Sequence, residues 1–213
     1  TCEKMMTEDL EQKGPFFQLK FKEILENLPE TANKDPKLVI PMQDQGPLIL
    51  EEIFPAMEEH FGDYEVLEAE EDLMEMIQDF SCEDKNKFKG FIDLVIKTPD
   101  DKIHIIDWKT CSWGWDARKR ADPMITYQLT FYKHFWAKKH NVDPSMIETH
   151  FALLKRTAKN NRVEIFRVTS GPRKTENALK FLEKAIYNIE KKNFIKNRLA
   201  CCKCEFHKTE HCP

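Results

Sequence analysis

The sequence lacks any apolar run long enough to span a bilayer. Its longest such runs, residues 48–50 and 151–154, fall far short of the roughly 20 residues that a membrane helix needs. No basic start followed by an apolar segment is present either, so no secretory signal is visible. The chain begins at Thr1, which leaves an upstream signal open. On these grounds we expect a cytoplasmic protein.

Lysine and arginine are absent from residues 51–80. Residues 1–80 carry 21 Asp and Glu against 6 Lys and Arg, a net charge of −15, whereas residues 81–213 carry 16 against 27, a net charge of +11. The basic part is suited to attract a polyanion such as nucleic acid. The alternative is that two halves of one fold neutralise each other, and composition does not decide between these readings.

The cysteines are unevenly spread and odd in number. Of seven, four lie in the last thirteen residues: Cys201, Cys202, Cys204 and Cys212. An odd count without a secretory signal argues against a disulfide framework. The terminal cluster therefore indicates a metal site, and we expect Cys82 and Cys111 to lie outside it.

Apolar periodicity predicts helices and strands in mixed order along 213 residues, of which 41% are hydrophobic. The prediction is helices at 16–27, 47–60, 123–139 and 173–192, and strands at 65–79, 88–97, 103–108, 146–156 and 162–168. Segments 29–45 and 111–121 are expected to be loops. This order predicts one α/β domain with a mixed central sheet flanked by helices.

Two aspartates are expected to meet in the hairpin of the second and third strands. Asp93 lies on one strand and Asp107 on the next, across the turn at 98–101. Asp107 and Lys109 are two residues apart, so they share a strand face. Two carboxylates bind Mg²⁺ or Mn²⁺ through oxygen, and a neighbouring lysine positions a water or stabilises developing negative charge. These groups together are suited to phosphodiester hydrolysis. An Asp-x-Lys triplet alone is weak evidence for that activity.

Three motifs now resemble a known family. Gly-Phe-Ile-Asp at 90–93 and Ile-Ile-Asp-Trp-Lys-Thr at 105–110 resemble motifs II and III of the PD-(D/E)XK nuclease superfamily. Gln128 and Tyr132, one helical turn apart, match the Gln-x-x-x-Tyr motif of its RecB-like exonuclease branch. The resemblance implies a restriction-endonuclease-like core, at about 46–192, within a single nuclease domain of residues 1–213.

The resemblance also implies roles. Asp93, Asp107 and the backbone carbonyl of Trp108 would bind Mg²⁺ or Mn²⁺, Lys109 would assist the attacking water, and Gln128 and Tyr132 would orient the strand. The family places a further acid on the preceding strand, for which we choose Glu68, with Glu70 as the next candidate. It often has a metal-binding histidine upstream, where this chain has Leu50. The nearby His60 is expected to be a surface helix residue.

The cysteine tail resembles that of iron–sulfur members of the family. These hold a [4Fe–4S] cluster through one N-terminal and three C-terminal cysteines, which here implies Cys2, Cys201, Cys204 and Cys212. The module, 193–213 with Cys2, would join the two termini. The spacing from Cys204 to Cys212 is longer than the usual family form, and Cys202 competes with Cys201. Zn²⁺ is the alternative, since His207 and His211 lie among the cysteines.

The segment after Lys109 is rich in aromatic and basic residues. It holds Trp113, Trp115, Arg118, Lys119 and Arg120. Rings with interleaved cations suit stacking on unpaired bases and contacts with phosphates. The alternative is that the tryptophans cover the edge of the core and the basic triplet is solvated.

From the motifs we expect a metal-dependent DNA exonuclease acting on single-stranded or frayed ends. The family resemblance implies roles in DNA repair, recombination, phage DNA processing or CRISPR spacer acquisition, in a bacterium or a phage-infected host, with recombination or replication proteins as candidate partners. Two alternatives stay open: a non-catalytic nucleic-acid-binding module with a structural metal, and a structure-specific or sequence-specific endonuclease.

Overall fold

The structure is a computed structural model that describes residues 2–8, 12–30, 32, 34–77, 86–193, 201 and 204–210. The chain divides into two compact units, Thr1–Ala178 and Leu179–Pro213. The first unit contains the sheet and the helices packed on it. The predicted 193–213 module, with its link to Cys2, stays a prediction, because Cys212 lies outside the described residues.

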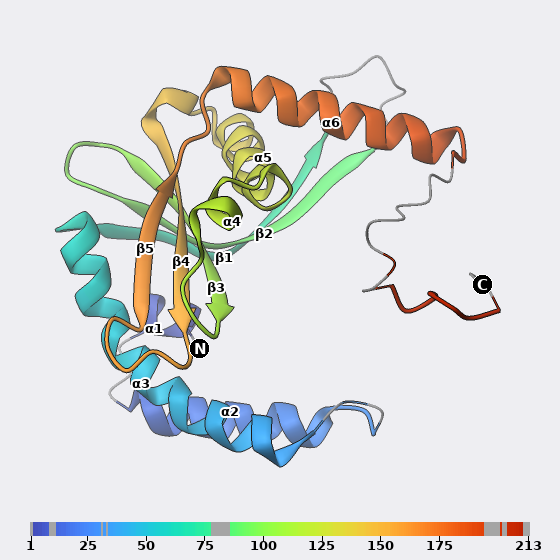
Figure 1. The fold of residues 1–213 in the computed structure, drawn as a ribbon. Coiled ribbons are helices and arrows are strands. Elements are labelled where there is room, and N and C mark those ends of the chain that lie inside the picture. Colours follow the sequence, from blue (N-terminus) through green and yellow to red (C-terminus); the bar gives the residue numbers. More distant parts are fainter. Residues whose placement is uncertain are drawn as a thin grey trace. The chain divides into compact units, whose positions relative to one another are not determined.

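A five-stranded mixed sheet forms the centre of the first unit (Figure 1). Its spatial order is β1-β2-β3-β4-β5, and every neighbouring pair is antiparallel except the parallel pair β3–β4. The strands are β1 (Glu65–Met76), β2 (Lys87–Lys97), β3 (Ile103–Cys111), β4 (Ile147–Lys155) and β5 (Val163–Val168). The predicted α/β class with a mixed sheet is thus confirmed.

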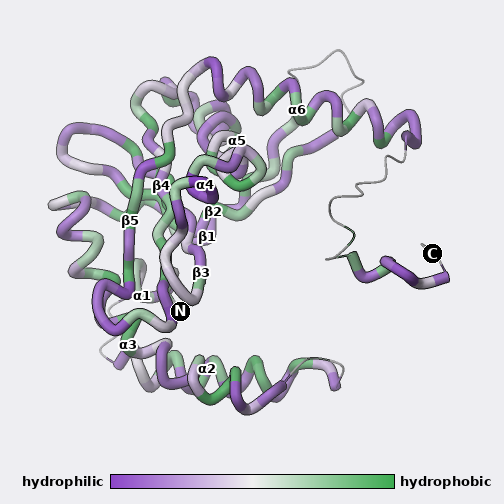
Figure 2. The backbone as a smooth tube through the Cα atoms, in the orientation of Figure 1, coloured by the Kyte–Doolittle hydropathy of each residue, from purple (hydrophilic) through white to green (hydrophobic). Residues whose placement is uncertain are grey.

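Helices cover both faces of the sheet. Parallel strands need a crossover, and the one between β3 and β4 contains α4 (Ala117–Ala121), α5 (Pro123–His140) and the 3₁₀ turn η1 (Pro144–Met146). Helix α5 packs on one face, and α1 (Cys2–Thr7) and α3 (Pro36–Phe61) pack on the other. Figure 2 shows the apolar stretches of the strands between these helices.

Two more helices belong to the part of the chain that the structure describes. Helix α2 (Lys13–Asn27) packs against α3, and α6 (Pro172–Glu190) follows β5 and continues into the second unit. Among the helices that the structure describes, none has the length and apolar character needed to cross a membrane.

The expected loop at 29–45 is partly wrong, because α3 begins at Pro36 and absorbs three further prolines. Asp35 caps the helix by accepting a hydrogen bond from the Lys37 amide at 2.9 Å, and a proline suits the first helical position. Pro41, Pro47 and Pro55 each remove one backbone donor. The helix survives because Ile49, Leu50, Ile53 and Met57 are buried against the sheet.

The backbone of β1 is irregular at Glu70, whose φ of +56° lies in the left-handed region. Residues two apart in a strand normally share a face. Here Ala69 packs with the α3 side of the core, whereas Glu71 is bonded to residues of α5. The pairing Ala69↔Leu94 and Glu71↔Ile92 brackets Asp93 on the facing strand. The change of face therefore occurs beside the first candidate aspartate.

Candidate active site

Asp93 is held by a backbone amide of the neighbouring strand. The β2–β3 ladder runs from Lys97↔Ile103 to Leu94↔Ile106. Immediately beyond it, the Trp108 amide donates to Asp93 Oδ2 at 2.8 Å. A side-chain carboxylate thus accepts a strand amide next to the end of the ladder. This bond places the Asp93 carboxylate beside the peptide that joins Asp107 to Trp108.

Asp107 is the centre of a buried polar chain. The residue is 2% exposed and follows four buried residues of the same strand. Lys109 Nζ lies 2.6 Å from Oδ2, and Gln128 Nε2 donates to Oδ1 at 3.0 Å. Gln128 Nε2 also donates to the Tyr132 hydroxyl oxygen at 2.9 Å. The structure therefore brings together Asp107, Lys109, Gln128 and Tyr132, as the motifs predict.

Burial sets the electrostatics of this chain. It raises the pKa of Asp107, and the attraction of Lys109 only partly opposes it. Burial also raises the pKa of Tyr132; the Gln128 hydrogen bond lowers it, and the charges of Asp107 and Asp93 raise it further. The Tyr132 hydroxyl therefore interacts electrostatically with both carboxylates. A buried, poorly solvated carboxylate next to a second one is an environment that a divalent cation stabilises.

Tyr132 lies directly on the backbone of β2. A Cβ atom built on Gly90 would come within 2.7 Å of its ring. The ring of Phe88 lies 6.4 Å from that of Tyr132, centroid to centroid, and stacks on Phe135 at 4.4 Å. The glycine of the Gly-Phe-Ile-Asp motif therefore has a steric task, because it lets the helix α5 tyrosine approach the strand.

The upstream acid and histidine of the family have no simple counterpart. Glu68 is exposed on β1, opposite Val95, and its metal role stays a prediction. Leu50 is 3% exposed and belongs to the core cluster on the α3 face. His60, expected on the surface, is indeed exposed, but its ring also lies 5.3 Å from that of His150.

Glu71 is a buried acid with several polar partners, and the sequence analysis did not single it out. It is 7% exposed and accepts hydrogen bonds from Trp136 Nε1 at 2.6 Å and Lys139 Nζ at 2.9 Å, with His140 Nε2 at 2.6 Å. These contacts outweigh burial and lower its pKa. Three partners on α5 make it an anchor between β1 and that helix. No sequence pattern distinguishes it from the acids around it.

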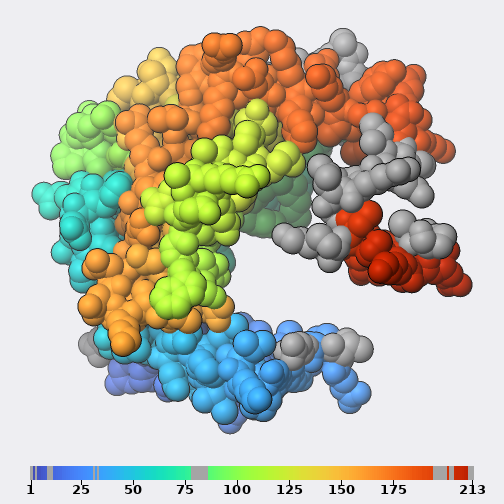
Figure 3. Space-filling view, viewed as in Figure 1, coloured from blue at the N-terminus to red at the C-terminus, as the bar shows by residue number. Residues whose placement is uncertain are grey.

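The aromatic and basic residues after Lys109 divide into two groups. Trp115 is 9% exposed and packs edge-on against Phe151. Arg120 donates to the Trp115 carbonyl and pairs with Glu164. Trp113, by contrast, is 68% exposed, and Arg118 and Lys119 are exposed on α4. Figure 3 shows this yellow-green segment at the surface. The segment 111–121 was expected to be a loop, and the structure shows that it contains the short helix α4.

The cysteines lie in different parts of the chain. Cys2 begins α1 and is partly buried against the core cluster. Cys111 ends β3. Cys201 and Cys204 belong to the second unit, joined by the Cys204 amide to the Cys201 carbonyl at 3.2 Å. Cys82, Cys202, His211 and Cys212 lie outside the described residues, so a cysteine-bound metal stays a prediction.

Comparisons with known proteins show the family to which the chain belongs. Residues 7–212 match the family model of the PD-(D/E)XK nuclease superfamily. The chain belongs to this superfamily. No curated protein matches it. A solved structure titled "Crystal structure of SSO0001" is similar, with 13% identity and a TM-score of 0.47, over 96% of this chain and 89% of that one.

The donor set of a PD-(D/E)XK site fits a hard divalent cation. Asp107 Oδ2 is fully buried and, within the described residues, has no aligned hydrogen-bond partner besides its ion pair with Lys109. Asp93 supplies a second carboxylate next to the same peptide. Carboxylate and carbonyl oxygens are the ligands that Mg²⁺ and Mn²⁺ prefer.

The contact between Gly90 and Tyr132 generates a testable prediction. In Gly90→Ala the new methyl group meets the Tyr132 ring at 2.7 Å, so the ring or the strand must move. We expect a loss of about 1–3 kcal/mol in the free energy of unfolding, measured by urea denaturation.

Gly14→Ala is the matched control. Its methyl group would meet Pro47 at 3.5 Å, an ordinary contact, within a helix. This variant should be neutral or more stable by up to about 1 kcal/mol. Equal losses in both variants would contradict the steric role assigned to Gly90.

Proposed function

We propose that this chain is an Mg²⁺- or Mn²⁺-dependent deoxyribonuclease that shortens DNA from single-stranded or frayed ends. The observation that carries the proposal is the continuous set of contacts from Lys109 through Asp107 and Gln128 to Tyr132, beside Asp93. It joins all three motifs on β2, β3 and α5. We assign the activity to the cytoplasm and to repair, recombination, phage DNA processing or spacer acquisition, as the resemblance implies.

Each residue has a role that its position supports. Asp93 and Asp107, with the Trp108 carbonyl and Glu68, would hold the cation. When bound, the ion supplies charge neutralisation at the phosphate and a more acidic water. Lys109, 30% exposed at its side chain, can reach both Asp107 and a solvent-side water or phosphate oxygen. Gln128 aligns the Asp107 carboxylate, and Tyr132 buttresses Gln128.

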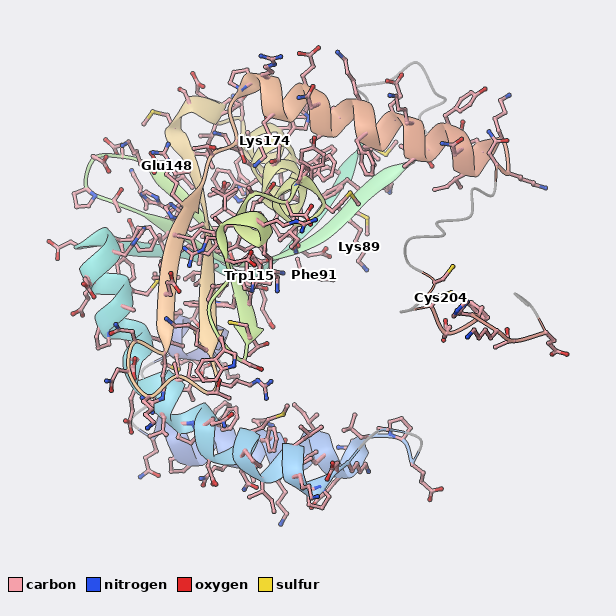
Figure 4. All side chains as sticks on the ribbon, in the orientation of Figure 1. Lys89, Phe91, Trp115, Glu148, Lys174 and Cys204 are labelled. Carbon is pink, nitrogen blue, oxygen red and sulfur yellow. The ribbon has the colours of Figure 1, made fainter. Side chains whose placement is uncertain are left out.

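Exposed rings on or directly after the strands that carry the motifs support a substrate with unpaired bases. Trp113 follows the end of β3 and is 68% exposed, and Phe91 is 53% exposed two residues before Asp93. Lys89 Nζ lies 5.2 Å from the centre of the Phe91 ring, and Figure 4 shows Lys89 and Phe91 on the same stretch of β2. Base stacking on such rings contributes roughly 1–3 kcal/mol per base.

A non-catalytic nucleic-acid-binding module is the second candidate. Leu50, which stands where the family often has a metal-binding histidine, is buried in the core. That observation favours a weaker or differently completed metal site. An endonuclease is the third candidate, and it would cut a circular substrate into fragments.

The first functional prediction concerns Asp107→Asn. Loss of the carboxylate charge should lower Mn²⁺-dependent release of nucleotides from an end-labelled DNA strand by roughly 10³-fold or more. The folded-state pKa of Asp107 lies above its unfolded value, so this carboxyl contributes less to stability as pH rises through that window. At neutral pH the variant should therefore be as stable as the wild type, or more stable by up to about 2 kcal/mol.

The matched control is Asp101→Asn in the β2–β3 turn. Its φ of +63° is one that asparagine tolerates, and its carboxylate pairs with Lys97. We expect normal cleavage. If wild-type protein binds the strand but cleaves neither linear nor circular DNA, the chain is a binding module; loss of cleavage in Asp101→Asn alone would place the site elsewhere.

The second functional prediction concerns the exposed rings. Trp113→Ala and Phe91→Ala should each weaken binding of single-stranded DNA about 5- to 100-fold, with little effect on stability because both rings are more than half exposed. Trp115→Ala serves as the contrast and should mainly destabilise the fold. Fluorescence anisotropy in Ca²⁺ at several salt concentrations measures binding, and unchanged affinity in both ring variants refutes the stacking role.

We further propose that Cys2, Cys201, Cys204 and Cys212 hold a [4Fe–4S] cluster, with Zn²⁺ as the alternative. The support for this assignment is the cysteine pattern of the sequence and its resemblance to the iron–sulfur members of the family. Anaerobically purified protein should be brown and contain four iron atoms per chain, lost in Cys204→Ser but not in Cys111→Ser. A colourless protein carrying zinc on these cysteines would exclude the cluster.

A further inference from the structure

A second group of metal-ligating side chains lies away from Asp93 and Asp107. It consists of His104 on β3 with Glu148 and His150 on β4, and their ligand atoms all lie within 4.8 Å of one another. The pairing Ile106↔His150 and His104↔Glu148 places them at the beginning of the parallel strand pair. Figure 4 shows Glu148 well separated from Phe91 and Trp115.

The hydrogen bonds around His104 leave one nitrogen as an acceptor. The Thr98 hydroxyl donates to Asp100 Oδ1 at 2.5 Å, so its oxygen can accept from His104 Nε2, which lies 3.0 Å away. In the neutral ring, Nδ1 then carries a lone pair. This lone pair faces His150 Nε2 at 3.1 Å.

The separation of these nitrogens suits two ligands of one ion. With Zn–N bonds near 2.0–2.1 Å and a tetrahedral angle, two nitrogens on one zinc lie about 3.3 Å apart. The bond from His104 to Thr98 is the outer contact that typically orients a metal-bound histidine. Closing the site thus requires shifts of a few tenths of an ångström at the histidine pair.

Burial keeps the two rings neutral, the charge state in which imidazole binds metal. Since His104 Nδ1 accepts from His150 Nε2, a metal bound at Nε2 requires the His150 ring proton to move to Nδ1. His104 is 6% and His150 2% exposed, and this burial lowers the pKa of both, that of His150 to about 3. Neutral imidazole is the ligand form. His150 Nδ1 is buried and, within the described part of the chain, lacks a hydrogen-bond partner. The pair is therefore polar, buried and incompletely satisfied.

Glu148 completes the donor set, and a route to solvent exists. Its Oε1 pairs with Arg167 at 3.1 Å and Lys102 at 3.6 Å; a carboxylate can keep such partners on one oxygen and bind an ion through the other. A surface pocket lined by His60, Phe61, Thr98, Lys102 and His104 opens beside the pair. The His60 ring lies against the His150 ring, next to the coordination position of the ion that the three ligands leave open.

We propose that His104 Nδ1, His150 Nε2 and the Glu148 carboxylate bind a Zn²⁺ ion, with the fourth position open to water or His60. Two imidazoles and one carboxylate form a donor set typical of zinc and poorly suited to Mg²⁺. The ion would tie the starts of β3 and β4 together. This site is independent of the nuclease proposal, since it shares no residue with the Asp93–Asp107 site.

Binding to the folded state raises the midpoint of thermal unfolding. At a hundredfold excess of zinc over Kd, the rise should be about 5–10 °C for a chain of this size. His150→Gln and Glu148→Gln should each abolish most of it and weaken zinc binding at least tenfold. His134→Gln, a change on α5, should retain it. A rise that persists in both cluster variants would assign zinc to another place, such as the cysteines, and overturn the proposal.

The location can be tested without any variant. Crystals of the full chain grown with one equivalent of Zn²⁺ should show an anomalous peak at the zinc edge, within about 2.2 Å of His104 Nδ1 and His150 Nε2. Magnesium-dependent cleavage by the wild type should proceed whether or not this site is filled. Zinc found at Asp107 or the cysteines, with no peak between the histidines, would overturn the proposal.

Discussion

The hydrogen bond from the Trp108 amide to Asp93 is the interaction on which the rest of the site depends. It begins where the β2–β3 ladder ends, so Asp93 replaces a strand carbonyl as the acceptor. Opposite this point, Glu70 of β1 has a left-handed φ; Ala69 before it packs on the α3 side, and Glu71 after it bonds to α5.

Burial of Asp107 is the second constraint, and it explains why so many polar groups converge on one side chain. An ionised carboxylate that is 2% exposed is costly unless it is paired. Lys109, Gln128 and, through Gln128, Tyr132 compensate part of this cost, but the pKa of Asp107 remains raised. A bound cation would stabilise the ionised form of this carboxylate. The buried charge thus costs folding stability when no ion is bound, in exchange for the ability to bind one.

Sequence patterns predicted the sheet, the crossover helix and the motif residues, because apolar periodicity and short motifs are local. They failed where the decisive contact is remote. Residues 29–45 were predicted to be a loop, yet α3 begins at Pro36, and burial of Ile53 and Met57 outweighs the donors missing at its internal prolines. Trp113 and Trp115 look alike in sequence, and only the packing of Trp115 on Phe151 separates them. Glu71 and the His104–His150 pair are invisible without tertiary contacts.

The central claim is that Asp93 and Asp107 form one metal site in a PD-(D/E)XK nuclease. Manganese scatters anomalously and substitutes for magnesium on oxygen ligands. Anomalous diffraction from wild-type crystals soaked in Mn²⁺ therefore locates the ion directly. The account predicts an anomalous peak within roughly 2.0–2.3 Å of carboxylate oxygens of both residues, with Lys109 drawn away from Asp107. A peak that touches one aspartate and not the other, or none at this position, would contradict it.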